Sequence, residues 1–417
     1  MGKLQIEGGR RLEGVIPISG AKNSALAIIM AAALAKGESI LENVPHDTDV
    51  AVACQILEEL GVKTFWDHEG KLHIQADNLR AYQAPHELVR KMRASFYVAG
   101  VLLARLGKAE VPLPGGCSLG SRPVDFHLKG FSSMGAEISI EYGCMKAEAK
   151  KLSGCKYYIN RASVGTTVNL MLAASLAEGT TLLENAAKEP EIVDLAIYLN
   201  SMGAKIRGAG TEVIRIDGVK ELVGVEYDVI PDRIEAGTYL LAAAITGGDI
   251  TVTDVVPEHL RAFLLKLRET GVQVEEGEST IRAICRERPK AVDIETAPYP
   301  GFPTDLQQPF LALMTIADGT SVIRETIFDR FRFVDELRLM GADVKTERDT
   351  AIVRGVDKLL AAPIEATDLR AGAALVLAAL AAEGVTTITG VEYLDRGYEF
   401  LEDKLASVGA KVKRLKE

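Results

Sequence analysis

Glycines that end predicted helices recur along the chain at intervals of about 70 residues, and this period constrains the fold most. An amphipathic segment precedes each glycine, and a short alternation of polar and apolar residues follows it, as at residues 137–140. Glycine can take the positive φ that closes a helix C-terminus. The period therefore predicts six structural repeats. The glycines are Gly61, Gly135, Gly203, Gly271, Gly341 and Gly409.

A second series of glycines runs out of phase with the first. Each of them ends a segment rich in small apolar residues and leads into a strand-like segment, as at residues 250–252. Two interleaved series predict that each repeat reads strand, helix, strand, helix, strand. The second series is Gly37, Gly107, Gly179, Gly248, Gly319 and Gly384.

One predicted helix in each repeat is apolar on all sides. A helix without a polar face must be buried all round, so the repeats cannot be stable singly and must cluster. An open row of six repeats and two closed globules of three both satisfy this need. Neither end of the chain carries a polar capping repeat, which favours the closed form. The apolar helices are predicted at residues 25–35, 96–104, 170–177, 240–245, 310–316 and 373–382.

The closed form corresponds to an α/β fold with two inside-out α/β barrel domains, each of three βαβαββ repeats with sheets outside and apolar helices at the centre. We expect one domain at residues 21–229, which carries repeats one to three and a mobile Cys117 loop. The other domain combines residues 1–20 with 230–417. The first strand, around residues 4–6, precedes the first repeat and is predicted to pair with the last one.

Composition excludes several classes of protein. The 417 residues carry a formal charge of -10, which argues against general nucleic-acid binding because phosphates require a basic surface. The longest apolar runs are shorter than the roughly 20 residues that cross a bilayer, and no signal peptide is evident. Five irregularly spaced cysteines are typical of a reduced compartment. We expect a cytoplasmic protein without metal or nucleotide cofactor, since the usual motifs for these are missing.

Residues able to bind anions or move protons occupy one phase of the repeat, just before each apolar helix. Helix N-termini attract anions through free N–H groups and the helix dipole. For one repeat alone, helix capping is the better explanation. Six such residues in phase instead favour a shared anion-binding cleft between the two domains. They are Lys22, Arg93, Ser163, Arg233, Asp305 and Arg370.

The position before the second helix adds further candidates. In repeat two it is a glycine-rich loop, residues 114–125, that contains Cys117 and Arg122. A nearby guanidinium lowers a thiol pKa from its usual value near 8.5, which would make Cys117 reactive. The alternative is a flexible loop with a partly buried thiol. Repeats five and six have Arg330 and Arg396 at this phase, and Arg332 is a second candidate for the Arg330 position.

Ten segments together resemble the enolpyruvyl transferase family, and within it the branch that acts on UDP-N-acetylglucosamine. They include Gly-Ala-Lys-Asn at 20–23, Pro-Gly-Gly-Cys at 114–117 and Phe-Pro-Thr-Asp at 302–305. The resemblance spans almost the whole chain in family order. The other segments lie at residues 92–95, 122–125, 163–165, 189–194, 231–235, 367–371 and 395–399.

This resemblance implies a reaction, in which the enolpyruvyl group of phosphoenolpyruvate passes to the 3-hydroxyl of UDP-N-acetylglucosamine by addition and elimination, releasing phosphate. It also implies a role at the first committed step of peptidoglycan synthesis, and hence in cell shape and division. The partners would be small molecules only, without a cofactor. The two domains would close on the substrates, and the drug fosfomycin would target Cys117.

The resemblance also assigns roles to single residues. Asp305 would accept the proton of the sugar hydroxyl, Cys117 would protonate the enol methylene carbon, and Lys22 would assist. Phosphoenolpyruvate would be bound by Lys22, Asn23, Arg122, Arg330, Arg370 and Arg396. UDP-N-acetylglucosamine would contact Asn23, Arg93, Arg122, Pro123, Val124, Asp125, Phe126, Arg161, Ser163, Val164, Asp305 and Ile327.

Three alternatives remain open from the sequence. One is 5-enolpyruvylshikimate-3-phosphate synthase, which shares the six repeats but lacks the Cys117 loop. Another is an RNA-terminal phosphate cyclase, which needs a reactive histidine and a nucleic-acid surface that six histidines and an acidic balance fit poorly. The third is a repeat scaffold without catalytic activity. Such a scaffold would not explain why cationic residues occupy the same position in several repeats.

Overall fold

The computed structural model describes residues 2–114 and 124–415. In it the chain forms two compact units. Unit 1 contains residues 2–19 and 231–415, and unit 2 contains residues 20–114 and 124–230 of the described chain. Within the described chain, the backbone passes from one unit to the other at Ser19 and again at Ile230.

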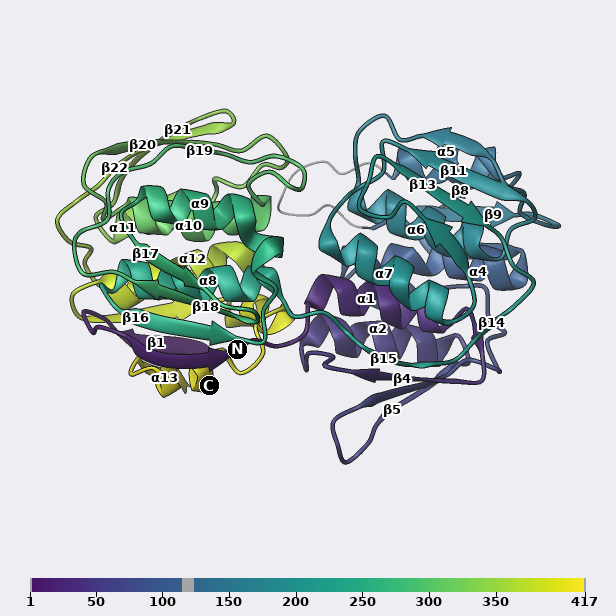
Figure 1. Ribbon diagram of the computed structural model, residues 1–417, viewed down its shortest axis with the longest axis horizontal. Coiled ribbons are helices and arrows are strands. Elements are labelled where there is room, and N and C mark those ends of the chain that lie inside the picture. The colour runs from purple at the N-terminus through teal and green to yellow at the C-terminus, as the bar shows by residue number, and fades with distance from the viewer. Residues whose placement is uncertain (1, 115–123, 416–417) are drawn as a thin grey trace. The chain divides into compact units, whose positions relative to one another are not determined.

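In unit 1 the apolar helices lie at the centre and the strands lie outside (Figure 1). Helices α8 (Arg233–Ile245), α10 (Gln307–Met314) and α12 (Leu369–Ala381) pack against one another. Every side chain of α8 after its first residue is buried, as the absence of a polar face predicts. The other helices of the described unit are α9 (Arg261–Glu269), α11 (Val334–Leu339), α13 (Leu401–Ser407), and the 3-10 helices η2 (Pro257–Leu260), η3 (Thr304–Leu306) and η4 (Val391–Arg396).

Three mixed sheets enclose these helices, and in each of them one parallel strand pair adjoins antiparallel strands. The first has the order β17 (Gln273–Glu276), β18 (Thr280–Ile284), β16 (Asp249–Thr253), β2 (Glu13–Pro17). The second has the order β19 (Ile294–Glu295), β20 (Thr320–Arg324), β22 (Thr350–Arg354), β21 (Asp343–Glu347). The third has the order β23 (Pro363–Glu365), β24 (Val385–Thr389), β1 (Lys3–Glu7), β25 (Lys411–Leu415).

Unit 2 repeats the same plan around α1 (Lys22–Ala32), α4 (Val98–Leu106) and α6 (Val164–Ser175). Only Asn23 of α1 is exposed. The second apolar segment begins as the 3-10 helix η1 (Arg93–Tyr97), which continues into α4. The remaining helices are α2 (Thr48–Glu59), α3 (His86–Val89), α5 (Asp125–Ser133) and α7 (Pro190–Ser201).

Two four-stranded sheets of unit 2 follow the same mixed pattern, whereas its three-stranded sheet is antiparallel. One has the order β15 (Glu226–Asp228), β4 (Glu38–Glu42), β6 (Leu72–Gln75), β5 (Lys63–Trp66). Another has the order β10 (Lys156–Tyr158), β11 (Thr180–Glu184), β13 (Val213–Asp217), β12 (Lys205–Arg207). A third has the order β7 (Lys108–Pro112), β9 (Cys144–Glu148), β8 (Glu137–Glu141), and a small parallel pair joins β14 (Leu222–Val223) to β3 (Ala35–Lys36).

The N-terminal strand completes the last repeat, as the sequence predicted. Strand β1 pairs antiparallel with both β24 and β25. Leu4 and Ile6 are fully buried on its inner face. The sixth repeat lacks a strand of its own at this place, so the other end of the chain supplies it.

The glycines of the first series are confirmed as helix ends, because each directly follows a helix C-cap residue. In the second series Gly107 caps α4, and the others lie two to four residues beyond a helix C-cap. All six of the first series have positive φ, as do five of the second. In the fourth repeat, however, Gly247 takes the positive φ, and the predicted Gly248 does not. Gly248 serves another need, because a Cβ there would lie 2.2 Å from the Leu12 carbonyl oxygen. Two adjacent glycines with different constraints explain the shift by one residue.

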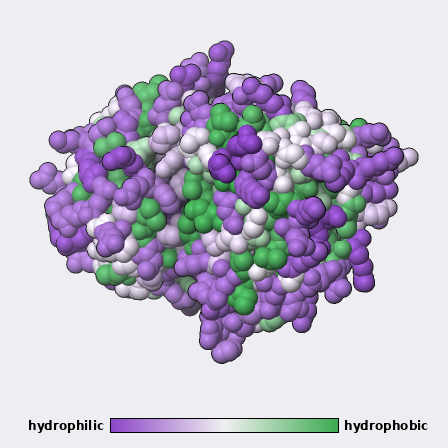
Figure 2. Space-filling model, turned by 45° about the vertical axis from the view of Figure 1, so that its right-hand side comes forward, coloured by the Kyte–Doolittle hydropathy of each residue, from purple (hydrophilic) through white to green (hydrophobic). Residues whose placement is uncertain are grey.

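The surface is mainly hydrophilic on the face shown in Figure 2, where hydrophobic residues form separate groups. The apolar helices are accounted for by the two cores rather than by a membrane, because each is enclosed within its own unit. Among the described residues, none of the helices has the length and apolar character required to span a bilayer.

Candidate active site

Asp305 of unit 1 lies between two buried arginines. Its Oδ1 accepts a hydrogen bond from Nη2 of Arg330 at 2.7 Å, and its Oδ2 accepts one from Nη2 of Arg370 at 3.1 Å. Both arginines are only 4% exposed, whereas the Asp305 side chain is 22% exposed. A carboxylate with one solvent-accessible edge thus compensates two buried positive charges, which could not stay buried unpaired.

The loop that carries Arg330 is held by the buried carboxylate of Glu325. This carboxylate accepts hydrogen bonds from the backbone N–H groups of Ile327 at 2.8 Å and Phe328 at 3.1 Å. It also accepts from the hydroxyls of Thr296 and Thr304 at 2.9 and 2.8 Å. Thr304 begins η3, which also contains Asp305. Glu325 therefore ties the predicted sugar-nucleotide residue Ile327 to the segment of Asp305.

Two hydrogen-bond donors of the Arg330 guanidinium are unpaired among the described residues. Its Nε and Nη1 are buried and have no hydrogen-bond partner within the described chain. A buried unpaired donor costs about 1–3 kcal/mol, so the site is built to receive an acceptor there. Arg332, the second candidate for this role, has an exposed side chain.

Arg370 is positioned by the start of α12 and by Tyr398. Asp368 caps the helix by accepting hydrogen bonds from the backbone N–H groups of Arg370 and Ala371, each at 3.0 Å. Nη1 of Arg370 donates to the Tyr398 hydroxyl at 3.3 Å. Burial by itself lowers the pKa of Arg370, but the Asp305 carboxylate and Tyr398 outweigh it and raise the pKa. The guanidinium therefore stays charged.

Two further predicted arginines lie at the expected phases of unit 1. Arg396 is half-buried at the end of η4, next to Asp395, whose carboxylate accepts two hydrogen bonds from Arg414. Arg233 opens α8, and its guanidinium lies 5.7 Å from the centre of the Tyr299 ring.

In unit 2, Lys22 opens α1 and forms a buried ion pair, with its Nζ 2.7 Å from Oδ2 of Asp49. The neighbouring Asp47 caps α2 by accepting from the Val50 N–H at 2.7 Å. Burial raises the pKa of Asp47 to about 7, although Lys22 acts to lower it. Asn23, beside Lys22, is exposed and accessible to a ligand.

A buried histidine adjoins Arg93 at the start of η1. The amide of Asn169 donates to Nδ1 of His127 at 3.1 Å and to the Phe96 carbonyl at 2.8 Å. Burial, and then the charge of Arg93, lower the pKa of His127 to about 3. The imidazole is therefore neutral near pH 7 and accepts at Nδ1.

The other sugar-nucleotide candidates of unit 2 lie at the starts of α5 and α6, which pack together. Ser163 caps α6 by accepting from the Thr166 N–H at 3.3 Å, and Val164 is the first residue of that helix. Val124 and Asp125 begin α5, and Phe126 follows, with its carbonyl accepting from the Tyr157 hydroxyl at 2.9 Å. Arg161 is exposed.

Three predicted site residues lie outside the described residues: Cys117, Arg122 and Pro123. The other four cysteines are described, and all are free thiols. Burial raises the pKa of Cys54 to about 12, and it also raises the pKa values of Cys155 and Cys285.

Comparison with known proteins decides the family. The family model for EPSP synthase (3-phosphoshikimate 1-carboxyvinyltransferase) matches residues 6–405. The chain belongs to this family of enolpyruvyl transferases. The protein is thus a transferase, and the predicted family is confirmed.

Curated relatives match over the full length of this enolpyruvyl transferase. The UDP-N-acetylglucosamine 1-carboxyvinyltransferase 2 of Symbiobacterium thermophilum is 56% identical over 416 residues, which cover 99% of this chain and 98% of the relative. The UDP-N-acetylglucosamine 1-carboxyvinyltransferase 1 of Caldanaerobacter subterraneus is 53% identical over 413 residues, 99% of each chain.

Solved structures confirm the predicted fold class of two inside-out α/β barrel domains. The enolpyruvyl transferase NikO from Streptomyces tendae has a TM-score of 0.90 at 27% identity, covering 99% of this chain and 98% of its own. EPSP synthase from Acinetobacter baumannii has a TM-score of 0.76 at 22% identity over the whole of both chains, a likeness of fold.

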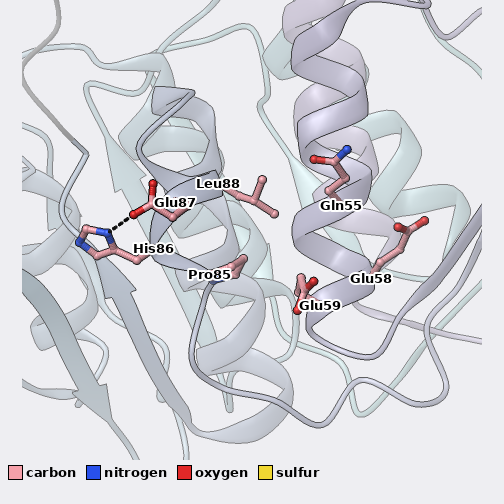
Figure 3. Close-up of a pocket in the computed structure, with 7 residues that line it drawn as sticks. All are labelled: Gln55, Glu58, Glu59, Pro85, His86, Glu87 and Leu88. Atoms are coloured by element: carbon pink, nitrogen blue, oxygen red, sulfur yellow. Dashed lines mark ion pairs between the residues drawn. The ribbon is translucent and has the colours of Figure 1, made fainter.

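Unit 2 of this enolpyruvyl transferase has a surface pocket (Figure 3). It is lined by α2 near its C-terminal end, including Glu58 and Glu59, and by residues 85–88. His86 and Glu87 form an ion pair at its edge. None of the predicted site residues lines this pocket. Within the described ranges, no cluster of three or more His, Cys, Asp or Glu side chains could hold a metal ion.

The sequence interpretation missed Asp49, Glu325 and the role of Tyr398. A signal for Asp49 was present, since it lies in the first turn of the second helix of repeat one, close to the phase of Arg330 and Arg396 in their repeats. Glu325 had no comparable signal, because its hydrogen bonds join two loops of the same repeat that only the fold brings together.

Proposed function

We propose that this enolpyruvyl transferase moves the enolpyruvyl group of phosphoenolpyruvate to the 3-hydroxyl of UDP-N-acetylglucosamine and releases phosphate. The observation that carries the proposal is the 56% identity, over 99% of the chain, with a relative named UDP-N-acetylglucosamine 1-carboxyvinyltransferase. The reaction would be the first committed step of peptidoglycan synthesis, which links the protein to cell shape and division.

The arginines of unit 1 suit the donor substrate. Phosphoenolpyruvate carries a carboxylate and a phosphate, and guanidinium groups bind both in a bidentate manner. The unpaired Nε and Nη1 of Arg330 would donate to one of these anions, with Arg370 and Arg396 in support. Lys22, Asn23 and Arg122 are the proposed contributions of the other half of the chain.

Asp305 suits the role of base because of its two arginine partners. In the structure both carboxylate oxygens are occupied by Arg330 and Arg370. We infer that the anionic groups of phosphoenolpyruvate compete for these donors when they bind. The carboxylate then becomes available to accept the proton of the 3-hydroxyl, a transfer worth about 10²–10⁴-fold in rate.

The remaining roles follow from the family resemblance. Cys117 would protonate the methylene carbon of the enol, aided by cations that favour its ionisation. The diphosphate and uridine would lie along residues 122–126 and 161–164, where the N-termini of α5 and α6 supply N–H donors, and Arg93 and Ile327 would also contact the sugar nucleotide. We also propose a cytoplasmic location, in which the free thiols of Cys54 and Cys285 stay reduced.

One assay tests the acceptor. Purified protein is mixed with phosphoenolpyruvate and either UDP-N-acetylglucosamine or shikimate 3-phosphate, and phosphate release is measured against a control without acceptor. We expect release only with the sugar nucleotide. The name of the matching family model makes shikimate 3-phosphate the relevant competitor. Release with that acceptor alone would replace the proposal, and release with neither would refute both.

A further inference from the structure

A buried chain of hydrogen bonds runs behind Arg370, away from Asp305. Nη1 of Arg370 lies 3.3 Å from the hydroxyl of Tyr398. That hydroxyl lies 2.9 Å from Oγ1 of Thr238, whose own hydroxyl is 2.9 Å from the carbonyl oxygen of Ile234. Tyr398 and Thr238 are both buried, so water does not compete for these bonds. This series of hydrogen bonds joins the start of α12 to α8 through the segment after η4.

The direction of every proton in this chain follows from its two ends. The Ile234 carbonyl can only accept a hydrogen bond, so Thr238 donates its single hydroxyl hydrogen to it. The Tyr398 hydroxyl must therefore donate to Thr238. Its lone pairs are left to face Arg370, which can only donate. Burial, above other influences, raises the pKa of Tyr398, so its hydroxyl keeps the proton that this arrangement requires.

We propose that Tyr398 is a positioning residue for phosphoenolpyruvate binding, because its hydroxyl, oriented by Thr238, fixes the Arg370 guanidinium. This inference rests on the function proposed above. Two contacts define the plane of the guanidinium: Asp305 at Nη2 and Tyr398 at Nη1. When Asp305 turns to the sugar hydroxyl, its contact with Arg370 weakens. Tyr398 then remains as the contact that keeps the arginine in place.

The hydroxyl can be separated from the ring by substitution. The Arg370 guanidinium also lies 5.5 Å from the centre of the Tyr398 ring, a cation–π contact that phenylalanine preserves. Tyr398→Phe thus removes only the acceptor. Tyr239→Phe is the matched control: Tyr239 is buried on the same helix as Thr238, and its hydroxyl is outside the series of hydrogen bonds from Arg370 through Tyr398 and Thr238 to Ile234.

The experiment compares steady-state kinetics and thermal unfolding of both variants with those of the wild type. A hydrogen bond to a charged group accounts for about 10- to 100-fold in affinity, so Tyr398→Phe should raise the KM for phosphoenolpyruvate by at least about tenfold. The kcat and the KM for UDP-N-acetylglucosamine should change by less than about threefold, and Tyr239→Phe should change none of them. Thr238→Val added to Tyr398→Phe should cause little further rise in the KM for phosphoenolpyruvate, because both substitutions act on the same series of hydrogen bonds.

Two results would overturn the inference. One is a KM for phosphoenolpyruvate that is the same in Tyr398→Phe and Tyr239→Phe. The other is a parallel rise in both KM values together with a lower Tm, which indicates a general structural role. If the wild type releases no phosphate, the proposed function fails by itself. Calorimetric titration with phosphoenolpyruvate then decides the role of Tyr398: weaker binding only in Tyr398→Phe supports it, and equal binding refutes it.

Discussion

His127 should lower the free energy of unfolding in mild acid, relative to a variant that lacks its imidazole. The imidazole is buried against Phe96 and accepts a hydrogen bond from Asn169, so protonation would place a charge without a partner in the core. Burial lowers the pKa of His127 to about 3 in the folded protein, from an ordinary value of 6.5. Between these two values the unfolded chain binds a proton that the folded chain does not. Stability is therefore lost as the pH falls below 6.5.

The size of the effect follows from the two pKa values. Each pH unit in this window costs about 1.4 kcal/mol of unfolding free energy. At pH 5, which lies about 1.5 units below the unfolded value, the loss relative to pH 7.5 is about 2 kcal/mol. Burial raises the pKa values of Asp47 and Glu235 to about 7. Protonation of these two carboxyls therefore increases the free energy of unfolding as the pH falls through the same window. A variant is therefore needed to isolate His127.

His127→Asn keeps an acceptor for Asn169 but cannot be protonated. Urea-induced unfolding at pH 7.5 and pH 5 measures the free energy of unfolding for the wild type and the variant. The difference between the two proteins should shrink by about 2 kcal/mol at the lower pH. The control His68→Asn, at a side chain that is 92% exposed, should retain the pH dependence of the wild type. An identical pH dependence in His127→Asn and the wild type would refute the reasoning.

Three further predictions concern the proposed site. Asp305→Asn should lower turnover by about two to four orders of magnitude while calorimetry still detects UDP-N-acetylglucosamine binding, and near-normal turnover would remove Asp305 as the base. Arg330→Met should raise the KM for phosphoenolpyruvate by at least about tenfold, whereas Arg332→Met should not; the reverse ranking in the same assay would assign the role to Arg332. The epoxide fosfomycin should modify Cys117 and spare Cys54, whose pKa burial raises to about 12; peptide mass spectrometry that finds the adduct on Cys54 alone contradicts this assignment.

Much of the fold could be read from local patterns. The positive φ at Gly61 and its five counterparts is a property of single residues, which glycine alone adopts readily. The burial of α8 and α12 follows from helices without a polar face. Aligning the six repeats was enough to find the shared position of Lys22, Arg370 and the other four candidates. The structure places all six at or beside helix N-termini.

The working geometry of the site depends on contacts between distant parts of the chain. Asp305 and Arg370 are 65 residues apart, and Tyr398 and Thr238 are 160 apart. No local pattern distinguishes Arg330 from Arg332, because both lie in the same loop after β20, with one residue between them. Arg330 differs from Arg332 because it is buried and paired with Asp305. Which side chains become buried depends on the packing of the whole unit. The sequence by itself determined which residue types stand at each helix start. Tertiary structure decided which of them touch, because hydrogen bonds and ion pairs depend on distances that local sequence does not encode.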